Sequence, residues 1–167
     1  MLPEVKKILY ATDLSDNAKV AMGWAMSLAN HYDATITTLH VMPDMVEEMS
    51  LAMGYAAATD FVSRSLKEYN KEKGDELRQT IIDKIKSACS EVHGDDLGAC
   101  RLDLNNVIIK TGHPVKEIVA EASQGEYDLV VMGRRGRGII DDVLLGSVAR
   151  GVVQKCPKPV LTIRYTG

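Results

Sequence analysis

Glycine and arginine residues gather directly after a short apolar run near the C-terminus. That run, residues 128–132, leads into Gly-Arg-Arg-Gly-Arg-Gly at 133–138, and Gly146-Ser147 opens an amphipathic stretch ten residues after Gly136. Glycine lets backbone N–H groups approach an anion because it has no Cβ. The first turn of a helix adds unpaired N–H groups and the positive end of the helix dipole. The order of strand, glycine-rich segment and helix start therefore predicts a phosphate-binding site.

Side chains in this segment fit the same chemistry. The Ser147 hydroxyl can donate a hydrogen bond to a phosphate, and Val148 can offer its backbone N–H. Arg134, Arg135 and Arg137 can add positive charge, and the alternative for each is a solvated loop side chain. The segment lacks the Gly-Lys-Ser/Thr of a P-loop and the glycine spacing of the dinucleotide fingerprint. Its interpretation therefore depends on the strand before it and the helix start after it.

A carboxylate and a second strand end are further candidates. Asp13 follows the apolar run 7–12 and can contact a ribose hydroxyl or support a metal beside phosphates. It can also cap a helix or form part of a turn, although the sheet geometry inferred below favours ligand contact. Val41 ends another apolar run, where it can lend backbone groups and an apolar wall to a planar base, or simply be a strand residue.

Catalytic and metal chemistry have weaker support. His40 and His113 lie at strand ends, but no nucleophile stands beside either, so we interpret them as structural or exposed imidazoles. Cys89 and His93, four residues apart, would share a helical face and could chelate a metal, but a buried cysteine and a surface imidazole are favoured. Three cysteines in this chain argue against a disulfide framework and are typical of a reducing compartment. We predict no catalytic residue and no metal ligand.

Length and charge restrict the class of protein. The chain has 167 residues, which fits one domain spanning 1–167. Its formal net charge of -3 gives no general attraction to nucleic acid or to an anionic membrane surface. The sequence shows no apolar run of membrane-spanning length and no signal-peptide layout at the N-terminus. We therefore expect a cytoplasmic protein that binds neither nucleic acid nor membrane.

Apolar periodicity predicts strands that alternate with helices. Apolar or β-branched runs predict five strands, at residues 7–12, 34–41, 106–110, 129–132 and 159–164. Helical spacing of apolar residues predicts helices over about 16–31, 60–93, 114–124 and 145–153. Residues from about 43 to 60 have no clear period, and we interpret them as a flexible excursion that covers a site or meets a partner.

This alternation predicts an α/β fold, an open five-stranded parallel sheet with helices on both faces. In such sheets a ligand binds beyond the carboxyl ends of the strands, at the point where strand order reverses. If the first and fourth strands are neighbours at that point, Asp13 and the glycine-rich segment share one crevice.

The glycine pattern resembles the ATP-binding motif of the universal stress protein family: Gly133, two residues, Gly136, nine residues, then Gly146-Ser147. The flanking sequences resemble the family too, at 128–133 before the motif and at 143–149 and 156–161 after it. Residues 8–15 resemble its opening strand and Asp-x-Ser turn, and residues 111–114 its third-strand exit. The resemblance covers nearly the whole chain and is least informative at 43–75.

This resemblance implies a fold of the adenine nucleotide α-hydrolase-like, Rossmann-like type and a cytoplasmic homodimer, formed through the last strand, with a stress-response role. It implies ATP as the ligand, with Mg or Mn. Asp13 would meet the ribose or adenine side, Thr12 would line the pocket beside it, and Val41 would contact adenine through its backbone. The residues implied around ribose and phosphates are Met132, Gly133, Gly136, Gly146, Ser147 and Val148.

Three functions remain open at this point. The favoured one is a regulatory module in which ATP orders the glycine-rich segment and residues 44–59, and so biases a dimer or partner surface. A second is slow ATP hydrolysis, for which Asp13 is the obvious metal helper but no general base can be named. A third is a nucleotide-independent module that binds an unidentified protein through the Met-rich excursion.

Overall fold

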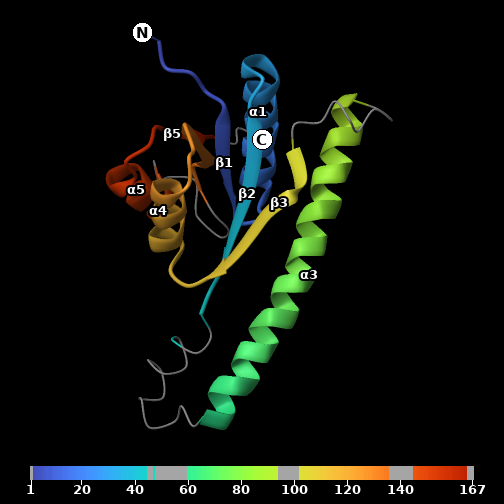
Figure 1. The fold of residues 1–167 in the computed structure, drawn as a ribbon, viewed down its shortest axis with the longest axis vertical. Helices are drawn as coiled ribbons and strands as arrows, with labels where there is room; N and C mark the ends of the chain where they lie inside the picture. The colour runs from blue at the N-terminus through green and yellow to red at the C-terminus, as the bar shows by residue number, and fades with distance from the viewer. Residues whose placement is uncertain (1, 45–46, 48–59, 94–101, 136–144, 165–167) are drawn as a thin grey trace.

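A computed structural model describes residues 2–44, 47, 60–93, 102–135 and 145–164 (Figure 1). The described strands form one parallel sheet of five, in the order β3-β2-β1-β4-β5. The predicted α/β fold with an open parallel sheet is therefore confirmed. The strands are β1 Lys7–Thr12, β2 Thr35–Met42, β3 Leu102–Thr111, β4 Leu129–Gly133 and β5 Val160–Ile163, and the helices are α1 Asp16–Tyr32, α3 Asp60–His93, α4 Pro114–Gln124 and α5 Ser147–Lys155.

Helices cover both faces of the sheet, which explains the continuous apolar runs in its central strands. In β1, Ile8 and Tyr10 belong to the core under α1 and α3. Leu9 and Ala11, which point the other way, belong to the core under α4 and α5. Figure 1 shows the two helix pairs on opposite sides of the strands. Successive residues of the central strands therefore pack alternately into two separate cores, one on each face of the sheet.

Strand order reverses between β1 and β4, as the shared-crevice prediction requires. The two strands pair in parallel, with Ala11 opposite Met132 near their carboxyl ends. At the other end, the Asp128 carboxylate accepts hydrogen bonds from the backbone N–H groups of Lys6 and Lys7, at 2.8 and 2.9 Å. These bonds anchor β4 beside β1, so the residues that follow both strands emerge side by side.

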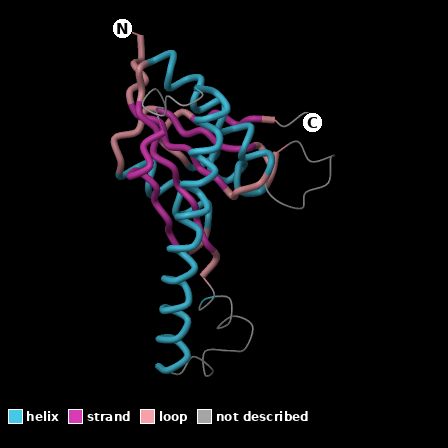
Figure 2. Tube along the Cα trace, turned by 90° about the vertical axis from the view of Figure 1, so that its right-hand side faces the viewer, coloured by secondary structure: helices cyan, strands magenta, loops and turns pink. Residues whose placement is uncertain are grey.

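Helix α3 runs without interruption through Gly74, and its later turns bury Ile81 and Ile85 against the sheet. Its first turns extend past the carboxyl ends of the strands (Figures 1 and 2). The predicted excursion at 43–60 lies almost wholly outside the described residues. Within the described part of the chain, no helix combines the length and apolar character needed to cross a membrane.

Candidate functional site

A cavity of about 270 Å³ opens where β1 and β4 end and where α4 and α5 begin. Eight of the nine residues predicted from the sequence line it, and the ninth, Gly136, lies outside the described residues. Arg134 and Arg135 also line it, whereas Arg137 is not described. The predicted residues on its wall are Thr12, Asp13, Val41, Met132, Gly133, Gly146, Ser147 and Val148.

The turn after β1 is held by its own side chains. Asp13 Oδ1 accepts hydrogen bonds from the backbone N–H of Ser15 at 3.0 Å and from its hydroxyl at 2.5 Å. Ser15 is the N-cap of α1, and its Oγ accepts from the Ala18 N–H. Thr12 Oγ1 accepts from the N–H of Leu14, whose φ of 64° is left-handed. Asp13 therefore forms part of the turn, which was one of the two roles predicted for it. It also borders the cavity.

The two ends of the glycine-rich segment are joined by a backbone hydrogen bond. The Gly146 N–H donates to the Arg134 carbonyl oxygen at 3.0 Å, and the Arg134 N–H donates to the Ile163 carbonyl of β5 at 2.8 Å. A Cβ on Gly133 would lie 3.3 Å from the carbonyl carbon of Asn17, in the first turn of α1. Gly133 thus has a packing reason to be glycine, because the end of β4 lies in close contact with that turn.

Positive charge is concentrated on one side of the cavity. Gly146 caps α5 without a side-chain hydrogen bond, and the first turn of α5 has no acidic residue. Within the described part of the chain, neither a side-chain cap nor an acidic residue of its first turn compensates its N–H groups and dipole. Burial lowers the pKa of the Arg134 guanidinium, and the nearby charges of Arg135 and Arg164 lower it further. Arg134 Nε is buried and has no hydrogen-bond partner, so this corner is suited to an anion.

Apolar side chains make up much of the remaining lining of the cavity. This apolar wall is made by residues that the sequence reasoning did not single out: Ala11, Leu39, Pro114, Ile118 and Ala149. Strand alternation was the available signal, because Ala11, Leu39 and Val41 all face the α4 and α5 side of the sheet. The helical contributions depend on where α4 and α5 cross the sheet, which no local pattern in the sequence reveals.

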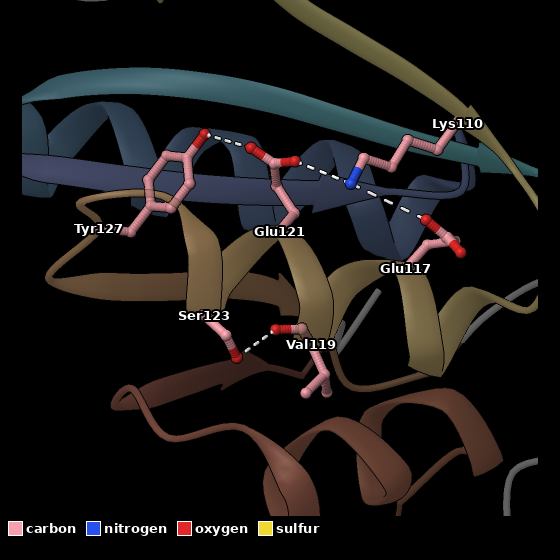
Figure 3. Close-up of polar contacts among 6 residues, drawn as sticks. All are labelled: Lys110, Glu117, Val119, Glu121, Ser123 and Tyr127. Atoms are coloured by element: carbon pink, nitrogen blue, oxygen red, sulfur yellow. Dashed lines mark hydrogen bonds and ion pairs between the residues drawn. The ribbon is translucent and has the colours of Figure 1, made fainter.

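Partly buried charges fix α4, which contributes Pro114 and Ile118 to this wall (Figure 3). The Lys110 ammonium of β3 lies 2.9 Å from Glu121 Oε2 and 3.8 Å from Glu117 Oε2. Tyr127 donates its hydroxyl to Glu121 Oε1 at 3.0 Å. Gly112, with a φ of 144° that side chains rarely adopt, makes the turn between β3 and α4. The network therefore ties both ends of α4 to the sheet.

The residues considered for catalysis or metal binding have other surroundings. His40 Nδ1 lies 2.7 Å from the Thr12 carbonyl oxygen, which can only accept, so this nitrogen carries the proton. His113 is an exposed N-cap of α4 that makes no side-chain cap bond. Cys89 is buried, as the favoured interpretation held. It is also disulfide-bonded, which the sequence analysis did not predict. The described residues contain no cluster of metal-binding side chains.

The model of the universal stress protein family matches residues 4–164. The chain belongs to this family. Universal stress protein MJ0577 of Methanocaldococcus jannaschii is 30% identical over 163 residues, a match that covers 95% of this chain and 94% of that protein. The family resemblance inferred from the glycine pattern and its flanks is therefore confirmed.

Solved structures of universal stress proteins share the fold. The structure of MJ0577 superposes with a TM-score of 0.69 at 27% identity, and the match covers 99% of each chain. UspA of Lactobacillus plantarum gives 0.74 at 25% identity, covering 98% of this chain and all of that one. A universal stress protein in complex with cAMP gives 0.56 at 20% identity, covering 96% of this chain and 98% of that one, which supports the fold alone.

Proposed function

We propose that this universal stress protein binds ATP in the cavity at the β1–β4 switch point and acts as a nucleotide-dependent regulatory module in the stress response. One observation carries the proposal: a single cavity is lined both by apolar side chains and by the N-terminus of α5, and it also borders Arg134, whose Nε is buried and unpaired. A planar base and a polyphosphate need such surroundings at opposite ends of one molecule.

Each candidate residue has a role in this proposal. The base lies against Leu39 and Ile118 and meets the backbone of Val41, while Thr12 and Asp13 border the ribose. Phosphates lie against the backbone of the glycine-rich segment, including Gly136, and against the first turn of α5. That second set is Met132, Gly133, Gly136, Gly146, Ser147 and Val148. Because the described residues lack a metal-binding cluster, we expect Mg or Mn to arrive bound to the phosphates.

The direct test is to denature the purified protein and analyse the supernatant for nucleotide, then titrate nucleotide-free protein with ATP and Mg by calorimetry. Val148→Trp places a large ring at the cavity wall and should abolish ATP binding. Val153→Trp is the matched control, because Val153 is 47% exposed on the same helix and is not part of the cavity wall. Absence of both bound nucleotide and binding heat in the unmodified protein would refute the proposal.

The same titration separates ATP from other nucleotides. A structural neighbour is described in complex with cAMP, which shares the base and ribose of ATP but carries a single phosphate. The basic corner favours a polyphosphate because each added negative charge gains from Arg134 and the α5 dipole. We therefore expect ATP to bind more tightly than cAMP. Equal affinities would remove the triphosphate from the proposal and leave an adenosine site.

Slow ATP hydrolysis remains the enzymatic alternative. The geometry does not favour it, because the Asp13 carboxylate is engaged in the turn with Ser15 and the described residues of the cavity wall include no other general base. Steady-state turnover that is lost in Asp13→Ala and Ser147→Ala would support hydrolysis. The nucleotide-independent alternative predicts that deleting residues 44–59 abolishes partner capture while ATP binding is unaffected or absent. Cytoplasmic location stays a prediction.

A further inference from the structure

A second cavity lies on the other face of the sheet, between α1 and α3. It measures about 250 Å³ and is walled by Tyr10 and Thr38 of the sheet, Met22 of α1, and Ile81, Ile85 and Ala88 of α3. All six of these side chains are buried. The body of this cavity is therefore mostly apolar, and it lies on the face of the sheet opposite to α4 and α5.

Thr38 gives the cavity a polar point. The residue is 1% exposed, and its Oγ1 is buried without a hydrogen-bond partner. A buried hydroxyl left unpaired costs about 1–3 kcal/mol, and such groups are exceptional in native proteins. The neighbouring Tyr10 hydroxyl cannot donate to it, because it already donates to the Ala18 carbonyl at 2.6 Å.

Both lysines at the rim of the cavity are already paired with other groups. The Lys19 ammonium lies 3.9 Å from Glu91 Oε1, and Lys84 Nζ donates to the Leu14 carbonyl at 3.2 Å. Asp16 is the remaining charged residue on the wall, so the rim carries two lysines and two carboxylates. No charged side chain lies among the buried residues around Thr38. A charged group placed there would lose its hydration without gaining a counter-ion.

We propose that this cavity binds a small neutral molecule with an apolar body and one hydrogen-bonding head group, of the phenol or short-chain alcohol class, with the head group paired to Thr38 Oγ1. Size is consistent with this class, because an apolar cavity of about 150 Å³ already holds benzene. Water is a poor occupant, since a buried water needs two to four polar partners and Thr38 is the one unpaired buried side-chain group that the described wall offers.

Phenol and toluene form a matched pair of probes, because they share a ring and differ by the head group. Both are titrated into the full-length protein and followed by amide NMR shifts. We expect phenol to shift amides of α1 and α3 and to bind about five- to tenfold more tightly than toluene, the ratio that one hydrogen bond supplies. In Thr38→Val, which keeps the side-chain shape, this ratio should fall to about one while toluene still binds.

Two further variants keep the test decisive. Ala88→Phe fills the cavity from α3 and should abolish binding of both probes. Val148→Trp, which blocks the nucleotide cavity, should leave phenol binding unchanged, so failure of the ATP proposal and failure of this one are distinguishable. The proposal is overturned if neither probe shifts α1 and α3 amides up to its solubility limit, or if phenol keeps its advantage over toluene in Thr38→Val.

Discussion

Arg134 carries an unusual set of surroundings for a loop arginine. Its Nε is buried without a partner, and its backbone N–H and carbonyl are both used to hold β5 and α5 in place. Burial lowers the pKa of its guanidinium, and Arg135 and Arg164 lower it further. An anion beside the side chain would pair with the unpaired Nε and offset the repulsion from Arg135 and Arg164, which supports the proposed phosphate contact.

We predict that Arg134→Gln lowers ATP affinity about tenfold, because a hydrogen bond from a charged guanidinium to phosphate is stronger than one from a neutral amide. Arg150→Gln is the charge-matched control, since Arg150 is exposed on α5 and is not part of the cavity wall. Calorimetry on both variants gives the comparison. Equal affinities in the two variants would show that Arg134 holds no phosphate.

Tyr10 gives a pH dependence to folding. Burial raises the pKa of its hydroxyl well above the usual value of 10.0, so the folded protein holds the proton that the unfolded chain releases. This stabilisation is complete below pH 10 and is lost as pH rises toward the folded-state pKa. We expect Tyr10→Phe to cost about 1 kcal/mol at neutral pH, where it removes the bond to Ala18, and to flatten the loss of stability above pH 10. Urea unfolding across pH measures both effects; an unchanged alkaline slope would contradict this assignment.

At the scale of elements, the attachment of α4 to the sheet depends on one lysine. Lys110 of β3 pairs with Glu121 and lies near Glu117, and all three side chains are less than one-third exposed. We predict that Lys110→Met destabilises the fold by about 1–3 kcal/mol, because two partly buried carboxylates lose their cation. Lys116→Met, at an exposed position of α4, should change little. Urea unfolding of the two variants measures the difference. Equal free energies of unfolding would show that the Lys110 ion pairs do not stabilise the fold.

Helices and strands with strong periods were predictable from the sequence, and the exceptions have physical causes. Strand β3 was predicted at 106–110 but spans 102–111. It is an edge strand, where exposed residues such as Asn105 and Asn106 are tolerated and interrupt the apolar pattern.

The candidate site was predictable where backbone chemistry has a local signal, namely glycines beside a helix start and a carboxylate after a strand. The apolar wall was not, because Pro114, Ile118 and Ala149 reach the cavity through the packing of α4 and α5. Gly133 shows the same limit. Sequence suggested room for an anion, whereas the structure adds its close contact with the first turn of α1.

At the scale of the whole molecule, β5 is an edge strand, and no strand of the described residues pairs with its outer side. The carbonyl oxygens of Pro159 and Ile163 accept from β4, so by the period of two the backbone of Val160 and Thr162 points away from the sheet. An open edge of this kind can pair with another strand. This geometry supports the proposal of a homodimer through the last strand.

We predict that Thr162→Pro dissociates the homodimer while the monomer stays folded, because proline removes an outward N–H and leaves the β4 pairing intact. Leu161→Pro, which removes an N–H on the β4 side, should instead destabilise the fold. Light scattering and circular dichroism on both variants separate the outcomes. A Thr162→Pro protein that remains dimeric would place the interface elsewhere.

Thr12 borders both cavities, one on each face of the sheet. Thr12 also takes part in two hydrogen bonds: its Oγ1 accepts from the Leu14 N–H, and its carbonyl oxygen accepts from His40 Nδ1. Any occupant that moves this residue changes the shape offered to the other. Thermodynamic linkage then requires reciprocity: a factor by which an aromatic alcohol alters nucleotide affinity must equal the factor by which nucleotide alters affinity for the alcohol. If both proposed ligands bind, each would thus change the affinity of the protein for the other by the same factor.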